Sequence, residues 1–354
     1  MRRLEEDYFQ PYTIPQPAGS LRMVTRVLQA SPGWFLARCV RDALLGLSLQ
    51  SESPGEIIDF EGGSVGLHTP VQPRKVVLCS FLESLPFWKQ HFDILGLNMN
   101  EFMAAGRFAF VDASTILHSM KPLETADKQP QPAKNPDPKE KGVVRANDVE
   151  PIKINLSEKL DEIDTSTKGP AVVEMFDSAI KEAIKAVGKF QAENKSLPNL
   201  PEASDEVVLV IDGLDFLIAS AEEQFVCSSD LTRSIMKVRP MVHSMTVSVS
   251  APPSADEELP DVPGIARQQR KLALYLVYQA RMMIQLKSLY PHTSSHPGVL
   301  IATRGAAFDQ DSPEQKALPE CWQEKELMYY HMSDGKVRTL RSQSSDPRQH
   351  GIIC

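Results

Sequence analysis

The sequence lacks the patterns that mark membrane proteins and zinc proteases. No uninterrupted apolar stretch reaches the roughly 18 residues that a membrane-spanning helix needs, so no membrane partner is expected. No secretory signal is expected either, because acidic residues follow the first positive charges where a long apolar run would be required. H-E-x-x-H does not occur, which argues against a zinc protease. We therefore expect no metal, no cofactor and no catalytic residue.

Cysteine is also scarce. The five cysteines form no C-x-x-C pair, and their number is odd. Cys39 and Cys79 lie in apolar segments, so a reducing compartment fits better than a disulfide framework. A cytoplasmic and nuclear location is expected.

The charge balance is acidic. A net charge of −8 and a pI near 5.6 argue against a whole-molecule electrostatic grip on nucleic acid, although they are compatible with a local basic face. The apolar content of 42% is ordinary for a globular chain, and 354 residues are enough for one sizeable core with excursions.

What the sequence does contain is an alternation of apolar strands and amphipathic helices. Strands are predicted at 21–27, 75–82, 107–112, 207–211, 244–250, 281–286, 298–303, 327–331 and 336–340. Helices are predicted at 34–47, 86–95, 97–105, 169–193, 231–242 and 265–279. Parallel neighbours need a crossover connection, and a helix is the usual one. The alternation therefore predicts an α/β fold with a mainly parallel sheet that finishes in antiparallel hairpins.

The strand predicted at 207–211 ends in a carboxylate, Asp212, and Asp215 follows three residues later. A buried parallel strand with an acid at its tip is typical of ATPases, in which the acid holds Mg²⁺ through water. Yet no G-x-x-x-x-G-K-[ST] stretch occurs, whose amides, lysine and hydroxyl would hold the phosphates and the metal. Two interpretations stay open. Asp212 ends the strand and caps the turn with Gly213, or the two acids are the relic of a metal site or complete a neighbour's site in a ring.

The segment after the first predicted strand takes the place of a phosphate loop. It contains Gln29, Ser31, Gly33 and Trp34. A helix N-terminus offers amide donors to an anion, but Pro32 removes one of them and Trp34 adds bulk. No lysine follows at the required place, so we do not expect ATP to bind here.

Three basic residues gather in the helix predicted at 265–279. Arg267, Arg270 and Lys271 are candidates for contact with RNA when the chain is assembled with others. The alternative is an ordinary solvated helix face.

Taken in order, these segments resemble the family of Elongator complex protein 6, most of all its filamentous-fungal members. The resemblance rests on VVLCSFL (76–82), FWK (87–89), LGL (95–97), GRFAFVD (106–112), VVLVIDGLD (207–215), VHS (242–244), GVLIATRG (298–305) and EKELMYY (324–330). These segments span nearly the whole chain apart from the N-terminal arm and the region 121–203.

The resemblance implies a RecA-like P-loop NTPase fold that has lost its Walker motifs. It further implies a non-catalytic subunit, a pseudo-ATPase, in a hetero-hexameric ring with Elongator proteins 4 and 5. That ring would join the core Elongator subunits, bind tRNA and support the modification of carbon 5 of the wobble uridine (U34). An atypical RecA-like NTPase acting on nucleic acid is the alternative.

Composition and resemblance together divide the chain into five parts. They are an extended N-terminal arm (1–20), a single RecA-like domain (21–120 and 204–342), a disordered insertion (121–168), a helix packing on the domain (169–196) and a flexible tail (343–354). The insertion is predicted because residues 121–150 are rich in proline and charge and contain no aromatic residue.

Overall fold

The computed structural model describes residues 9–27, 30–47, 72–115, 168–189, 203–220, 226–251, 264–289, 298–308, 325–332 and 335–339. In this part of the chain nine strands form one sheet, in the order β3-β2-β4-β5-β1-β6-β7-β8-β9. The strands are β1 (Ser20–Val27), β2 (Lys75–Ser80), β3 (Phe108–Asp112), β4 (Val207–Asp212), β5 (Ser244–Ser250), β6 (Met282–Ser288), β7 (Gly298–Arg304), β8 (Lys325–His331) and β9 (Val337–Thr339).

The sheet is parallel from β3 to β6 and antiparallel from β6 to β9. This is the predicted arrangement of a parallel sheet that finishes in antiparallel hairpins. The helices are α1 (Gln10–Thr13), α2 (Gly33–Leu45), α3 (Leu85–Ile94), α4 (Met99–Ala104), α6 (Lys168–Lys189), α7 (Phe216–Ser220), α8 (Ser228–Val238) and α9 (Gly264–Gln279), with a 3-10 turn η4 (Arg239–Met241).

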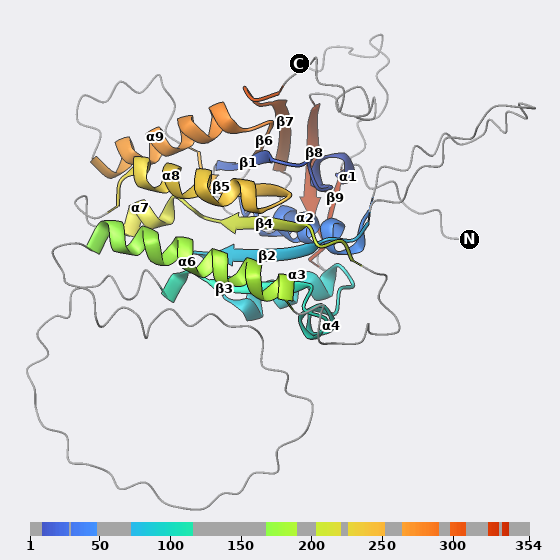
Figure 1. The fold of residues 1–354 in the computed structure, drawn as a ribbon. Coiled ribbons are helices and arrows are strands. Elements are labelled where there is room, and N and C mark those ends of the chain that lie inside the picture. The colour runs from blue at the N-terminus through green and yellow to red at the C-terminus, as the bar shows by residue number, and fades with distance from the viewer. Residues whose placement is uncertain are drawn as a thin grey trace, which may run out of the picture.

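The helices cover both faces of the parallel strands (Figure 1), with α6, α8 and α9 on one face and α2, α3 and α4 on the other. Strand β4 is continuously apolar because both of its faces are buried. Leu209 and Ile211 belong to the core under α6, α8 and α9, whereas Val208 and Val210 belong to the opposite core. A strand buried on both faces has no polar side to alternate with.

The region after the predicted insertion folds as expected where it is described. Helix α6 packs against β2, β3 and α8. Helix α8 ends at Val238, and Pro240 lies in η4. The α-helix predicted over 231–242 therefore ends before this proline, which has no amide hydrogen to donate to the next helical hydrogen bond. Residues 121–167 and 343–354 lie outside the described residues, so the insertion and the tail stay predictions.

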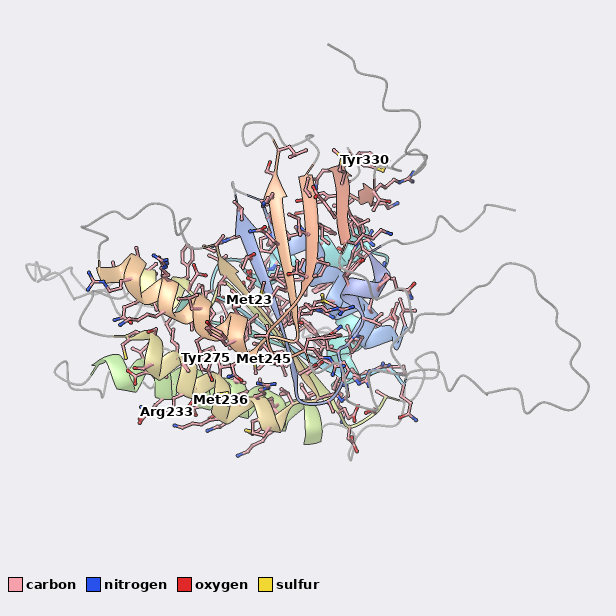
Figure 2. The ribbon with its side chains drawn as sticks, turned by 90° about the horizontal axis from the view of Figure 1, so that it is seen from above. Met23, Arg233, Met236, Met245, Tyr275 and Tyr330 are labelled. Carbon is pink, nitrogen blue, oxygen red and sulfur yellow. The ribbon has the colours of Figure 1, made fainter. Side chains whose placement is uncertain are left out.

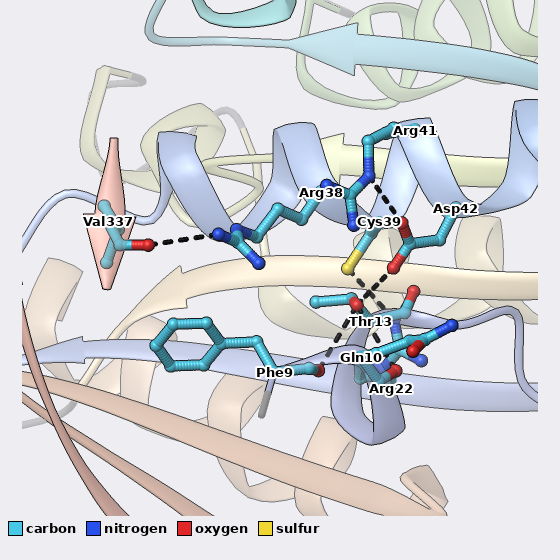
Figure 3. A network of polar contacts seen from close by, with 9 residues as sticks. All are labelled: Phe9, Gln10, Thr13, Arg22, Arg38, Cys39, Arg41, Asp42 and Val337. Carbon is cyan, nitrogen blue, oxygen red and sulfur yellow. Dashed lines mark hydrogen bonds and ion pairs between the residues drawn. The ribbon is translucent and has the colours of Figure 1, made fainter. Parts of the chain in front are cut away.

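The N-terminal arm differs from the extended segment predicted at 1–20. Over residues 9–20 it forms α1 and packs on the domain: Phe9 and Tyr12 are 1% and 2% exposed. Figure 3 shows the polar contacts that hold it, in which the Thr13 hydroxyl donates to the buried carboxylate of Asp42. The guanidinium of Arg22, also buried, donates to the carbonyl oxygens of Thr13 and Ile14. A four-residue helix has too short a pattern for sequence periodicity to indicate it.

Candidate functional site: a phosphate-loop position without a phosphate loop

A cavity of about 470 Å³ lies where α2 begins, at the carboxyl ends of several parallel strands. In open α/β sheets this edge is where ligands bind. The cavity is lined by Arg26, Ala30, Ser31, Pro32, Gly33, Leu82, Glu83, Phe87, Asp212 and Ser250. The fold thus brings the predicted positions Ser31, Gly33 and Asp212 together.

Asp212 is 2% exposed, and both of its carboxylate oxygens accept hydrogen bonds from neighbouring strands. Ser80 on β2 donates its hydroxyl to Oδ2 at 3.0 Å, and Ser248 on β5 donates to Oδ1 at 2.9 Å. Burial raises the pKa of Asp212, although these two hydrogen bonds and the charge of Arg26 act in the opposite direction. The carboxylate therefore serves as an acceptor that joins three strands, which favours a structural role at the strand end; the turn after it is capped by Ser248 and not by Asp212 itself.

The same two serine hydroxyls also accept backbone amides from the turns that follow β2 and β4. The Ser80 hydroxyl oxygen accepts the amide of Glu83 at 3.0 Å, and that of Ser248 accepts the amide of Gly213 at 2.8 Å. Gly213 has a φ of 73°, and an added Cβ would lie 2.7 Å from Leu82. Glycine alone fits this turn without strain.

Asp215 does not line the cavity. It is 2% exposed, and its carbonyl oxygen accepts the amides of Ile218 and Ala219 at the start of α7. Its Oδ1 has no hydrogen-bond partner among the described residues. The structure therefore does not pair Asp215 with Asp212 at the cavity.

Most backbone amides in the first turn of α2 donate to acceptors within that turn. The amide of Gly33 donates to the Ser31 hydroxyl at 3.3 Å, and Pro32 has no amide hydrogen. The amides of Phe35 and Leu36 donate to the carbonyl oxygen of Pro32 at 3.0 and 2.9 Å. A phosphate loop holds its ligand through a series of free amides. This turn does not present such a series.

The structure corrects the expected role of Trp34. Its indole is 6% exposed and does not line the cavity, so it adds no bulk there. It packs instead against Phe9 and Tyr329, with ring centroids 5.0 and 4.9 Å away. The aromatic group at the cavity is Phe87 of α3, which would lie 3.5 Å from a Cβ added to Gly33. Gln29 lies outside the described residues.

The cavity also contains charged groups that sequence reasoning missed. Arg26 at the end of β1 donates from Nε and Nη2 to the Ser250 hydroxyl, at 3.2 and 3.1 Å. Its single positive charge faces the carboxyl groups of Glu83 and Asp212. A triphosphate needs a net positive surrounding, which this set does not supply. The sequence did offer one indication of these residues. Parallel strands place their carboxyl ends at the same side of the sheet, and Arg26 and Ser250 lie near the carboxyl ends of two predicted strands.

The basic residues predicted to face RNA lie elsewhere. Arg267, Arg270 and Lys271 are exposed on α9 and do not line the cavity. Across the part of the chain that is described, no group of three or more His, Cys, Asp and Glu side chains is placed to hold a metal ion. Nor does any helix there have the length and apolarity needed to cross a bilayer.

Two solved structures are similar to this chain in outline. One is a KaiC-like protein of the hyperthermophilic archaeon Pyrococcus horikoshii, 12% identical, with a TM-score of 0.45, 93% of this chain covered and 96% of that one. The other is an uncharacterized protein of Pyrococcus horikoshii in complex with an unknown peptide, 9% identical, with a TM-score of 0.45 and coverages of 92% and 94%. No family model matches the sequence, and no curated protein matches it. The strand order β3-β2-β4-β5-β1, with α2 starting after β1, is that of a RecA-like α/β fold, as predicted.

Proposed function

We propose that this chain is a non-catalytic, RecA-like subunit of a hetero-hexameric ring formed with Elongator proteins 4 and 5. Its task is to support modification of wobble uridine in tRNA through assembly and tRNA binding. The observation that carries the non-catalytic part is the state of Asp212. Each of its two carboxylate oxygens accepts a hydrogen bond from a serine hydroxyl on a neighbouring strand. A carboxylate engaged in this way is poorly placed to position a metal-bound water.

The assembly part is supported by the resemblance of the ordered segments from 76–82 to 324–330 to that family. A RecA-like sheet without phosphate ligands can still present surfaces to neighbours, because function resides in sites and interfaces that the fold carries. Closed rings are a common way to bury such surfaces.

Co-expression with the two paralogues tests the assembly. We expect native mass spectrometry to detect a complex with two copies of each chain. A chain that stays monomeric in the presence of both paralogues at micromolar concentration would overturn the proposal. The contribution to tRNA binding is measured by filter binding of the purified ring, with duplex DNA as the competitor.

The alternative function is an atypical NTPase, and the open cavity beside Glu83 is the feature that favours it. A phosphate-release assay on the isolated chain separates the two, with Glu83→Gln and Asp212→Asn as controls. We expect no release above the protein-free background. Turnover that is present in the unmodified chain and lost in either variant would support the enzyme.

A further inference from the structure

One side of α9 is basic at its beginning and apolar at its end. Arg267, Arg270 and Lys271 are exposed, and they are followed by Leu274 and Tyr278, which are 48% and 67% exposed. Residues spaced by three and four lie on the same side of a helix. The five side chains therefore form one stripe, which we call the α9 stripe.

Helix α8 widens this surface. Met236 on α8 is 43% exposed, and Arg233 and Lys237 are exposed beside it. Figure 2 labels Arg233 and Met236 on α8 and Tyr275 on α9, and the two helices contact each other. The α8–α9 face thus combines large apolar side chains with basic ones.

The two helices are joined at both ends, so the face is rigid. At one end the Ser228 amide and hydroxyl both donate to Oε1 of Gln268, at 3.1 and 2.7 Å. At the other end Nη1 of Arg239 donates to Oε1 of Gln279 at 3.1 Å. A surface that is already ordered loses little entropy when a partner binds.

The face is positively charged although the chain as a whole is negative. Helix α9 carries three cations and no acidic residue, in a chain with a net charge of −8. On α8, Arg233 pairs with Asp230 at 3.3 Å, and Lys237 lies 3.9 Å from Asp177. The cations of the α9 stripe form no ion pair with any residue that the structure describes. The N-terminal end of a helix adds further positive potential. A partner that complements this face must therefore present acidic groups to the start of α9.

The apolar end decides which acidic partner fits. Leu274, Met236 and the aromatic ring of Tyr278 offer a strip that gains free energy only when it is covered by apolar groups. Phosphates of a nucleic acid satisfy the cations but leave the two aliphatic side chains in water. We propose that the α8–α9 face docks a segment of a neighbouring protein chain that presents apolar side chains followed by carboxylates. This mode resembles the docking of an amphipathic helix in a groove.

The proposal rests on the proposed function in one respect: the partner is sought in the ring formed with the two paralogues. Tyr278 is replaced by a photo-crosslinking phenylalanine analogue, the ring is purified and irradiated, and the linked peptides are identified by mass spectrometry. We expect a peptide of a paralogue that contains apolar residues and Asp or Glu. Crosslinks to tRNA, to a second copy of this chain, only to its own residues, or none at all would overturn the docking proposal. If the ring itself does not form, the proposed function fails, which is a separate outcome.

Two variants measure the energetic part. Leu274→Asp with Tyr278→Asp is expected to weaken association with the crosslinked paralogue by about tenfold or more, because exposed anchors of this kind contribute most of the affinity. Met328→Asp is the matched control, since Met328 is 43% exposed on β8, at the antiparallel end of the sheet. Equal affinities for the two variants would contradict the proposal. Circular dichroism verifies that each variant keeps its fold.

Charge complementarity is tested separately. Lys271→Glu is expected to weaken the same association, and reversing the carboxylate of the crosslinked peptide to lysine is expected to restore it. Lys325→Glu, on an exposed position of β8, is the control. An unchanged affinity for Lys271→Glu would remove the proposed ionic part. A variant that loses tRNA but keeps the paralogue would assign the face to RNA instead.

Discussion

The hydroxyl of Ser80 lies 3.0 Å from Oδ2 of Asp212, across the boundary between β2 and β4. Ser248 on β5 donates to the other carboxylate oxygen, so Asp212 links β4 to the strands on both of its sides. The same residue type at the same strand end can hold a metal-bound water when a phosphate loop faces it. In this chain the acid contributes to the stability of the sheet edge.

Replacing Asp212 is therefore expected to reduce stability. Asp212→Ala leaves the hydroxyls of Ser80 and Ser248 without their acceptor and lowers the free energy of unfolding by about 1–3 kcal/mol. Asp212→Asn, which keeps one acceptor oxygen, has a smaller effect. Urea unfolding followed by circular dichroism measures both, with the exposed Asp93→Ala as control. If Asp212→Ala unfolds at the same urea concentration as the control, the structural role assigned to this acid is wrong.

His243 predicts a pH dependence. Burial and the charge of Arg74 lower its pKa, although Glu206 lies 3.0 Å from its Nδ1. In the unfolded chain, His243 is protonated near its ordinary pKa of 6.5, whereas in the folded chain it is protonated only at lower pH. Stability is therefore lost as the pH falls below about 6.5, and His243→Gln removes this loss. The measurement compares urea midpoints of both chains at about pH 7.5 and about pH 5.5, and parallel changes in the two would rule the effect out.

The N-terminal contact with the domain predicts a large loss of stability. Phe9→Ala removes a ring that is 1% exposed and packs against Trp34, so the free energy of unfolding should fall by about 3–5 kcal/mol. Leu45→Ala, at a side chain that is 38% exposed, should cost much less. Thermal unfolding of the two variants measures the difference. Similar melting temperatures would mean that the arm is not part of the core.

The thiols should react in a defined order. Burial raises the pKa of Cys39 to about 11 and raises that of Cys79 further, and both side chains are buried, whereas Cys227 is partly exposed. The thiolate is the reactive form, so an aromatic disulfide reagent should label Cys227 first in a Cys321→Ser, Cys354→Ser background. Cys39 and Cys79 should react only when denaturant is added. Rapid labelling of either one in the native chain would contradict their burial.

Much of the fold was determined by local patterns that the sequence carries openly. The strand at 207–211 was indicated by its apolar run, because burial of a strand on both faces leaves a continuous signal. The same holds for α2 and α9, whose apolar side chains recur at helical spacing. The acid at the end of β4 and the missing phosphate loop were equally visible.

Only the tertiary structure decided what these groups contact. Nothing in the local sequence places the Trp34 indole against Tyr329 on β8, or brings Arg26 and Phe87 to the cavity near Asp212, because these residues are far apart along the chain. Sequence periodicity reports which side of an element is apolar, and it is silent on which distant element meets that side. The chemistry of a strand end depends on neighbours in space. The absence of a Walker A sequence was therefore visible in the sequence, and the contacts of the acid at the end of β4 were not.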